Sequence, residues 1–506
     1  MQTRTNAQSL PKKKSHSTPS EHSLKTIPES SLAHTLWLAA QGAFAVSEQG
    51  QAADDWLGTL NTKQKPAVQH YLYISLRWWW RAGGILKFCI NTPPPVELQM
   101  LMRVVLASLI ELDHVFNTAQ ITESQHSAEI ALLVNQAIDT IKYIESGKFG
   151  FFAGVANAVF RRFLREKQTL ETAVLQQADA LNAKVFSFNF PAWWINQVQS
   201  DYPKDWQTIL KASRARAPMT LRVNTRQLAV TDYLTALKTA NIEAFAIGEQ
   251  AIVLAQPVAV SKLPLFEQGA VFVQDSGAQL AADWINPTSG QLVLDVCAAP
   301  GGKTTHLLER TDCRVVAVDI DPQRLDRLQE NIERLGLTDR SIQIRVADMS
   351  QPDYLTELRI APKSFDHVIC DVPCSGSGVV RRHPDIALLR RPSDLSSLPA
   401  VSQAILHNAW QALKPGGHFL MVTCSIFKQE NIQVLERFLK EHSDAQLVRY
   451  QQLLPNSPES NLRIYNDALS SESTKNLDHR VQFADGFFFA LIQKQEKTHR
   501  TKPKRV

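Results

Sequence analysis

The sequence predicts a multidomain protein in which an all-α domain and a small α+β module precede an α/β domain built on a doubly wound sheet. Residues 31–170 show apolar side chains at helical spacing throughout. Residues 171–287 mix alternating runs with helical pieces, and residues 288–493 alternate short apolar runs with helical patterns, as βαβ units do. A chain of 506 residues with 44% hydrophobic residues is large enough for these separate cores.

Two polar tails flank these domains. Residues 1–30 are rich in Ser, Thr, Pro and Lys and are predicted to be disordered. They hold five Lys or Arg against two Glu, and residues 494–506 hold six against one. The tails therefore carry +3 and +5, and the rest of the chain carries −3 of the overall +5. Basic tails of this kind suit nucleic acid, although solvated termini without a partner are an equally good interpretation.

The sequence contains no apolar run long enough to span a bilayer. The N-terminal segment, which includes Lys12, Lys13 and Lys14, lacks the apolar core of a secretory signal. We therefore expect a cytoplasmic protein with no membrane association. In a reducing compartment its six cysteines are expected to be buried or reactive thiols and not a disulfide framework.

The all-α domain contains two clusters that could meet RNA. The run from Arg77 to Arg81 places three tryptophans between arginines, and these rings could stack on bases. On an amphipathic helix, packing is the more common use of tryptophan, and we favour it here. Arg161, Arg162 and Arg165 could contact phosphates or form an ordinary solvated helix face.

The α+β module of residues 171–287 is a second candidate RNA-binding region. It contains strand-like segments such as TLRVNTRQ and helical ones such as DYLTALKTAN. Four guanidinium groups lie close together in its sequence, at Arg214, Arg216, Arg222 and Arg226. Clustered arginines are typical of surfaces that bind the RNA backbone.

The α/β domain begins with a strand, a glycine turn and a helix that together predict a nucleotide-cofactor pocket. The apolar run LVLDV is followed by Pro300, Gly301 and Gly302, a helix over residues 303–309, and a second strand over 313–318 that leads to Asp319. A carboxylate at this spacing can bind ribose hydroxyls, and the first-turn N–H groups of the helix face the turn.

A phosphate-binding loop is the main alternative for this turn, because Gly302-Lys303-Thr304 imitates its end. That loop requires a glycine where this chain has Cys297, and a GxGxxG dinucleotide fingerprint is also absent. S-adenosylmethionine fits better, since it presents a ribose and no phosphate.

Later strands of this domain end on further polar side chains. The third strand ends at Asp348, where a carboxylate could bind the adenine amino group, although a simple turn residue is also possible. The fourth strand leads to Asp371 and Cys374, and the fifth ends near Cys424. Because the carboxyl ends of parallel strands meet at one edge of a sheet, we expect these side chains to converge beside the cofactor turn.

The two thiols at this edge allow three interpretations. They could be small buried side chains, as single cysteines usually are. They could bind zinc together with Cys370 and His383, but Cys370 is expected to face the other side of the sheet and no CxxC pair exists, so we expect no metal. Nucleophilic catalysis is favoured, because a thiolate at the ligand-binding edge of an α/β sheet is a strong nucleophile.

These motifs resemble those of a known family. CAAPGGKT, VDIDPQRL, DVPCSGSG, RRHPDI and TCS are similar to the motifs of the RNA cytosine-5 methyltransferases of the Nop2/Sun/Fmu group. The helical region with VNQAIDTIKY and FFAGVANAVFRRFLRE resembles the NusB-like RNA-binding domain that bacterial members acting on 16S ribosomal RNA place first. The resemblance covers residues 31–493, and this order of domains points to the bacterial 16S enzymes.

The resemblance implies a Rossmann-like methyltransferase domain that uses S-adenosylmethionine and no metal. The residues implied to line the cofactor are Cys297, Ala298, Ala299, Pro300, Gly301, Gly302, Lys303, Asp319, Asp348 and Asp371. Of these, Asp319 would hold the ribose, Asp348 the adenine, and Asp371 would lie against cofactor and target base. Cys424 would be the nucleophile, adding to carbon 6 of cytosine, and Cys374 would assist product release.

The implied substrate is 16S rRNA or a small-subunit precursor, bound by a monomeric protein. The target base must leave its stack, and Arg381, Arg382 and His383 are expected near the RNA backbone. Alternatives are a cytosine-5 methyltransferase of 23S rRNA or tRNA, a methyltransferase of a protein or small molecule, and a non-enzymatic NusB-like RNA-binding protein. The polar region 442–484 is expected to be a solvated loop.

Overall fold

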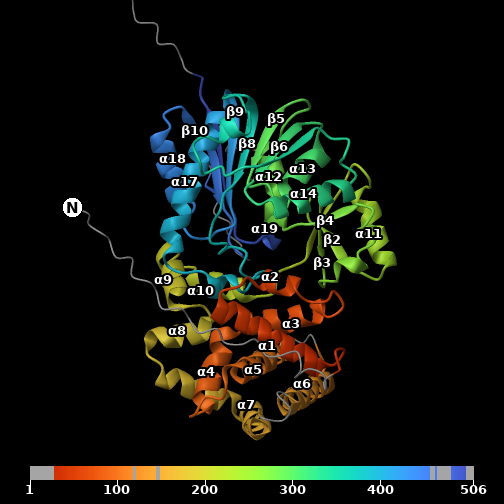
Figure 1. The fold of residues 1–506 in the computed structure, drawn as a ribbon, viewed down its shortest axis with the longest axis vertical. Helices are drawn as coiled ribbons and strands as arrows, with labels where there is room; N and C mark the ends of the chain where they lie inside the picture. Colours follow the sequence, from red (N-terminus) through yellow and green to blue (C-terminus); the bar gives the residue numbers. More distant parts are fainter. Residues whose placement is uncertain (1–27, 118–120, 144–148, 456–461, 464–479, 497–506) are drawn as a thin grey trace, which may run out of the picture. The chain divides into compact units, whose positions relative to one another are not determined.

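The computed structural model describes residues 28–117, 121–143, 149–455, 462–463 and 480–496 (Figure 1). The chain divides into two compact units. One comprises Met1–Phe44 and Trp56–Val174, and the other comprises Ala45–Asp55 and Leu175–Val506. Each unit is described by itself. Within the described residues, no helix is both long and apolar enough to cross a membrane.

The first unit is helical, as the periodicity predicted. Its helices, some of which run into the second unit's residues, are α1 (Leu32–Gln49), α2 (Ala53–Gly58), α3 (Lys65–Arg77), α4 (Trp79–Cys89), α5 (Val96–Asn117), α6 (Glu123–Tyr143) and α7 (Gly150–Gln177). Helix α5 is apolar over most of its circumference and packs against α3, α4 and α6. A helix that is buried on nearly all sides forms the centre of a bundle. The comparison of this unit with NusB-like domains stays a prediction.

Packing, and not base stacking, explains the first two residues of the tryptophan run. Trp78 and Trp79 are only 3% and 7% exposed. The indole N–H of Trp78 donates to buried Glu111 at 2.6 Å, and the guanidinium of Arg103 lies 3.9 Å from the centre of the Trp79 ring. Buried tryptophans of this kind need a partner for the indole N–H, and Glu111 supplies it.

The second unit opens with helices and a small sheet. After α8 (Ala180–Phe188), α9 (Ala192–Asp201) and α10 (Trp206–Arg214), the sheet contains β1 (Thr220–Val223), β2 (Ala244–Ala246), β3 (Ala251–Leu254) and β4 (Val271–Val273). Its order is β2-β3-β1-β4 with antiparallel pairs, and α11 (Val230–Thr239) buries Tyr233 and Leu237 against it. The predicted α+β character therefore begins at Thr220, and the three helices α8, α9 and α10 precede it in the sequence.

The large sheet has eight strands in the order β11-β10-β12-β9-β8-β5-β6-β7. Its strands are β5 (Leu292–Val296), β6 (Arg314–Asp319), β7 (Ile342–Val346), β8 (Phe365–Asp371), β9 (Leu413–Thr423), β10 (Ala445–Gln452), β11 (Leu462–Arg463) and β12 (Phe488–Lys494). The strands from β9 to β7 pair in parallel, whereas β12, β10 and β11 add antiparallel pairs. The chain adds strands outward from β5 to β7 and then returns to place β8 on the other side of β5. The carboxyl ends of β5 and β8 therefore lie at the point where the strand order reverses, which is where open α/β sheets bind ligands.

Helices cover both faces of this sheet, so the predicted doubly wound architecture is confirmed (Figure 1). One face packs against α12 (Ser276–Ile285), α13 (Gly302–Arg310) and α14 (Pro322–Arg334), and the other against α17 (Asp394–Ala412) and α18 (Ile432–Glu441). The short helices are η3 (Val260–Lys262), α15 (Tyr354–Glu357), α16 (Ile386–Leu389) and α19 (Arg480–Phe483). Gly336 follows α14 with a φ of 67°, a left-handed conformation common after a helix end.

The polar region 442–484 corrects one prediction. We expected a solvated loop, but Ala445–Gln452 form strand β10, which pairs antiparallel with β12. Leu447 and Tyr450 of β10 pack against the core on the α17 and α18 face. Val448 packs against the core on the opposite face, so the segment is held in the sheet by backbone pairing with β12 and by apolar contacts on both faces. Residues 456–461 and 464–479 lie outside the described part of the chain.

Candidate functional site

The turn between β5 and α13 is shaped by two left-handed residues, Cys297 with φ 60° and Gly301 with φ 99°. The N–H of Ala298 donates to Val318 O at 3.0 Å, and the N–H of Ala299 donates to the Asp319 carboxylate at 3.1 Å. A Cβ at Gly301 would lie 2.3 Å from Cδ1 of Leu328, so this position requires glycine. The turn is thus fixed against the neighbouring strand and helix.

The first-turn N–H groups of α13 point into this turn because a helix start leaves its N–H groups without intrahelical partners. Asp319 ends β6 and is buried, and its second carboxylate oxygen accepts the N–H of Asp321 at 3.1 Å. Ile320, the next residue, is 61% exposed. An exposed apolar side chain beside a buried carboxylate suits a ligand with a flat ring joined to a sugar.

Asp348 follows β7, the strand next to β6, which ends at Asp319. Its carboxylate accepts the N–H and the hydroxyl of Ser350, at 2.9 and 2.7 Å, and the side-chain amide of Gln351 at 3.1 Å. The Ser350 hydroxyl lowers the pKa of Asp348 most, which keeps this carboxylate charged near neutral pH. Both predictions, a turn residue and an available carboxylate, are compatible with this geometry.

Lys303 connects the turn to the end of β8. Its ammonium donates to Asp371 at 2.5 Å. Burial alone would lower the pKa of Lys303, but Asp371, Asp295 and the thiolate charge of Cys424 outweigh it and raise the pKa on balance. Lys303 therefore stays protonated between two carboxylates and a sulfur.

Asp295, in the middle of β5, is a residue that sequence analysis missed. It is fully buried and accepts the hydroxyl of Thr304 at 2.5 Å, while its other oxygen has no hydrogen-bond partner. Burial is the largest cause of a pKa raised to about 7. The signal in the sequence was a lone acid within an apolar strand, because acids are rarely buried without a reason.

The two predicted catalytic thiols meet. The sulfur atoms of Cys374, in the loop after β8, and Cys424, just past the end of β9, lie 3.5 Å apart. Strands β8 and β9 are neighbours, and the N–H of Gly378 donates to Cys424 O at 2.9 Å, which ties the two loops together. The hydrogen bond to Cys424, followed by burial, raises the pKa of Cys374 well above its ordinary value. Cys374 therefore holds its proton at neutral pH.

The other nearby cysteines are unsuited to nucleophilic attack. Burial raises the pKa of Cys297 and of Cys370 well above that of a free thiol. Cys370 packs in the core of the α17 and α18 face, whereas Cys424 packs against the opposite face, as the sequence analysis expected. In the described ranges, no three His, Cys, Asp or Glu side chains gather as metal ligands would.

Among the residues expected near the RNA backbone, Arg381 needs correction. Arg381 is 1% exposed and forms an ion pair with buried Asp485, so it is a core residue. Arg382 is paired with both Asp485 and Asp275, and His383 lies 3.4 Å from Asp54. A buried guanidinium requires a carboxylate partner inside the protein, and Asp485 is that partner. Arg381 is therefore not available to RNA.

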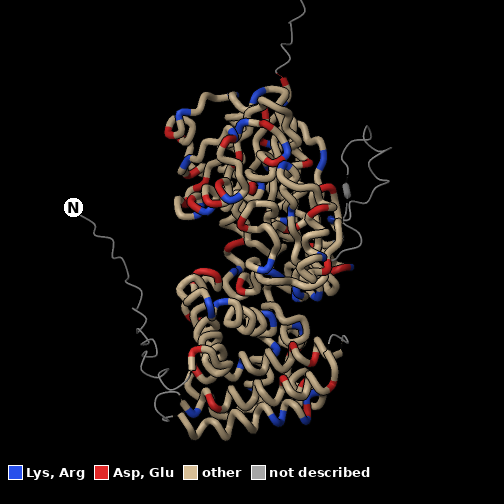
Figure 2. The backbone as a smooth tube through the Cα atoms, turned by 90° about the vertical axis from the view of Figure 1, so that its right-hand side faces the viewer, with Lys and Arg blue, Asp and Glu red and all other residues tan. Residues whose placement is uncertain are grey.

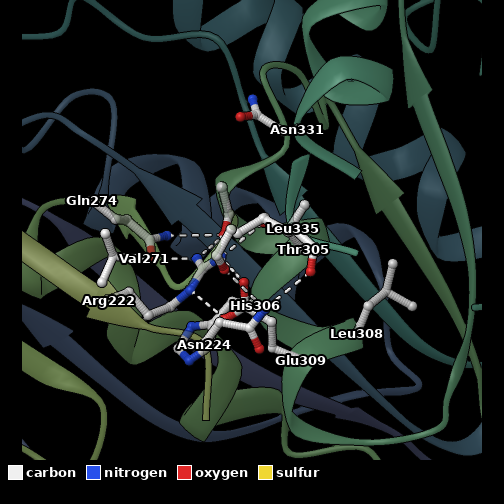
Figure 3. Close-up of polar contacts among 12 residues, drawn as sticks. Arg222, Asn224, Val271, Gln274, Thr305, His306, Leu308, Glu309, Asn331 and Leu335 are labelled. Atoms are coloured by element: carbon white, nitrogen blue, oxygen red, sulfur yellow. Dashed lines mark hydrogen bonds and ion pairs between the residues drawn. The ribbon is translucent and has the colours of Figure 1, made fainter. Parts of the chain in front are cut away.

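The arginine cluster of the small sheet also needs correction. Arg222 is completely buried and donates to Glu309, Gln274, Thr305 and the carbonyl of Gly302. Figure 3 shows this side chain reaching from β1 to helix α13. It therefore braces the helix that follows the glycine turn and does not form part of an RNA surface.

Arg226 also contacts the large domain, through Leu308 O at 2.9 Å and Asp312 at 2.8 Å. Elsewhere on the described chain, Lys and Arg interleave with Asp and Glu (Figure 2). The described chain thus carries side-chain charges of both signs along its length, in keeping with the net charge of −3 for the residues between the two tails.

Comparisons with known proteins identify the family of this chain. Residues 282–493 match the family model described as 16S rRNA methyltransferase RsmB/F, and residues 190–261 match the ferredoxin-like domain of RsmF/B-like methyltransferases. The ribosomal RNA small subunit methyltransferase B of Vibrio vulnificus is 34% identical over 464 residues, which are 90% of this chain and 98% of that protein. The Yersinia enterocolitica protein of the same name is 40% identical over 68% of this chain and 73% of its own length.

Among solved structures, the crystal structure of PH0851 covers 91% of this chain and 98% of its own, with a TM-score of 0.65 and 21% identity. This likeness concerns the fold.

The fold, the glycine turn and these matches define a Rossmann-like RNA methyltransferase. At the level of sequence identity reported above, the chain belongs to the RsmB/F family of 16S rRNA methyltransferases.

Proposed function

We propose that this chain transfers a methyl group from S-adenosylmethionine to carbon 5 of a cytosine in 16S rRNA, with Cys424 as the nucleophile and Cys374 assisting product release. The observation that carries the proposal is the 3.5 Å separation of the two sulfur atoms beside the glycine turn. The relatives named ribosomal RNA small subunit methyltransferase B support the choice of substrate. The substrate is 16S rRNA or a small-subunit precursor.

The residues of the turn fit the methyl donor. The segment Cys297 to Lys303 would line its methionine and ribose side. One oxygen of Asp319 already accepts from the Asp321 N–H and the Arg324 guanidinium, and the other, which accepts the Ala299 N–H, would also accept from a ribose hydroxyl. Asp348 would accept from the adenine amino group, and we add Ile320 as an apolar contact for the adenine ring. When bound, S-adenosylmethionine supplies an electrophilic methyl group on a sulfonium.

Cys424 begins the reaction. Its thiolate forms a bond to carbon 6 of cytosine, and the electron pair of the carbon 5–carbon 6 double bond moves onto carbon 5. Carbon 5 would then take the methyl group as the methyl–sulfur bond of the donor breaks, with the electrons of that bond left on the donor sulfur. Asp371 would lie against N3, and the ammonium of Lys303, which is paired with Asp371, would offset the negative charge that the addition places on the ring.

Cys374 ends the reaction. Once Cys424 is bonded to carbon, its sulfur no longer accepts the hydrogen bond that is the largest cause of the raised pKa of Cys374. Cys374 then gives up its proton to solvent more readily, and the thiolate so formed takes the proton from carbon 5. Loss of that proton re-forms the double bond and expels the Cys424 thiolate.

Methylation with labelled S-adenosylmethionine tests this function. The wild type, Cys424→Ala and the control Cys89→Ala are incubated with unmethylated 16S rRNA, 23S rRNA or tRNA, and the product nucleoside is identified by mass spectrometry. We expect 5-methylcytidine in 16S rRNA from the wild type and the control, and none from Cys424→Ala. Methylation by Cys424→Ala, or a label on another atom, contradicts the proposal. RNA binding without any methylation would favour a non-enzymatic role.

A further inference from the structure

A buried carboxylate connects the two turns that carry the thiols. Glu430, which is 2% exposed, lies between β9 and α18. It accepts the N–H and the hydroxyl of Ser375, both at 2.6 Å, and also the hydroxyl of Ser425. Ser375 is the residue after Cys374, and Ser425 is the residue after Cys424. One side chain therefore holds the backbone next to both sulfur atoms.

The hydroxyl groups around Glu430 extend this connection. Because a carboxylate only accepts, the Ser425 hydroxyl donates to it and uses its oxygen to accept the N–H of Phe427 at 3.0 Å. The Ser377 and Ser425 oxygens lie 2.9 Å apart, and Ser377 accepts the N–H of Ile426 at 2.9 Å. The turn after Cys374 and the turn after Cys424 are thus joined by hydrogen bonds between their serine residues. Because Glu430 accepts the Ser425 hydroxyl proton, the Ser377 hydroxyl is the donor to Ser425.

We propose that Glu430 is the positioning residue that keeps the sulfur atoms of Cys374 and Cys424 at the separation that addition to the ring and product release require. The proposal rests on the proposed function for the roles of the two thiols. Glu430 acts through Ser375 and Ser425. The two sulfur atoms lie 3.5 Å apart, and a shift of either one by a fraction of that distance would slow product release after Cys424 has added to the ring.

The charge of Glu430 also distinguishes the two thiols. Burial raises the pKa of Glu430 on balance, while the hydrogen bonds from Ser375 and Ser425 and the nearby Arg390 limit that rise because they favour the ionised carboxylate. The negative charge adds to the causes that raise the pKa of Cys374, after the hydrogen bond to Cys424 and burial. Glu430 therefore helps to keep Cys374 protonated while Cys424 attacks.

The variant Glu430→Gln tests this role, with Glu441→Gln as a control on the exposed side of helix α18. Glutamine keeps the shape of the side chain but has no charge and places a donor where the hydroxyl groups donate. Two quantities are measured: kcat and KM for methylation, and the pH dependence of Cys374 alkylation by iodoacetamide, followed by peptide mass spectrometry without RNA.

For Glu430→Gln we expect kcat to fall about tenfold or more, with KM for RNA and for S-adenosylmethionine within about twofold of wild type. We also expect the midpoint of Cys374 alkylation to move to lower pH. Glu441→Gln should match the wild type in both measurements. A Glu430→Gln protein with wild-type kcat and an unchanged alkylation profile overturns the proposal.

Ser425→Ala keeps the charge and removes one connection, and it serves if Glu430→Gln does not fold. We expect a lower kcat with an alkylation midpoint close to wild type, and a wild-type kcat would overturn the positioning role. Failure of the proposed function is recognised separately, because Cys424→Ala would then keep its activity. The alkylation profile would still report whether Glu430 controls Cys374.

Discussion

The guanidinium of Arg222 in β1 and the carboxylate of Glu309 in α13 form an ion pair at 2.7 Å in which neither side chain is exposed to solvent (Figure 3). The same guanidinium donates to Gly302 O in the glycine turn at 2.6 Å. The small sheet is therefore attached to the helix that begins at the cofactor turn. A change in the small sheet is expected to reach the cofactor through this contact.

Arg222→Met should destabilise the protein strongly. It leaves Glu309 buried without its partner, which typically costs about 3–5 kcal/mol of unfolding free energy. Chemical denaturation followed by fluorescence measures this loss. The double variant Arg222→Met with Glu309→Met should recover most of it. The more exposed pair of Arg226 and Asp312 is the control, and Arg226→Met should cost about 1 kcal/mol or less. Equal losses for both arginines would contradict the role of Arg222.

Gly301→Ala should weaken binding of S-adenosylmethionine by about tenfold or more, because the new Cβ would meet Leu328 and force the turn to shift. Gly290→Ala is the matched control. Gly290 has a similar φ of 81°, but nothing lies within 4 Å of a Cβ placed there. Both changes carry a backbone penalty of about 1 kcal/mol, and only the first should alter affinity measured by calorimetry. Equal affinities for the two variants would count against the turn as the cofactor site.

The buried carboxyl of Asp295 should make stability depend on pH. In the unfolded chain its pKa lies near the ordinary value of 3.8, whereas burial raises it to about 7 in the folded protein. The stabilisation is therefore complete below pH 3.8 and is lost as pH rises to about 7. Over that range the wild type should lose roughly 4 kcal/mol relative to Asp295→Asn. Denaturation of both proteins across this pH range measures the difference.

Asp366→Asn serves as a control of opposite sign. Burial would raise the pKa of Asp366, but the N–H of Leu292 and the Lys414 ammonium outweigh it and lower the pKa. The stabilisation from this carboxylate is therefore present above its unfolded pKa and is lost in acid. A difference between wild type and Asp295→Asn that does not change with pH would show that Asp295 is ionised in the folded protein.

The sequence predicted those parts of the site that follow from strand order. Asp319, Cys374 and Cys424 each follow a strand of the parallel sheet, and strands of one sheet end at a common edge, so their approach could be inferred from motif and pattern. The motifs of Cys374 and Cys424 lie 50 residues apart, and the adjacency of β8 and β9 brings them together.

The sequence could not predict contacts that depend on packing between distant elements. Arg222 was interpreted as a surface charge because its partner Glu309 lies 87 residues away and no local pattern relates the two. Arg381 was misjudged for the same reason, since Asp485 is 104 residues away. Glu430 stands in a polar segment after TCS, and only the folded structure turns it toward Ser375.

The most direct test of the two-thiol mechanism is the fate of Cys374→Ala in the presence of RNA and S-adenosylmethionine. The methyl group should still be transferred, but the bond between Cys424 and the ring should persist because its release is slowed. A denaturing gel should then show a protein–RNA adduct that carries the methyl label and is absent from the wild type and from the double variant Cys374→Ala with Cys424→Ala. Normal turnover by Cys374→Ala without an adduct, or an adduct that survives in the double variant, would contradict the account.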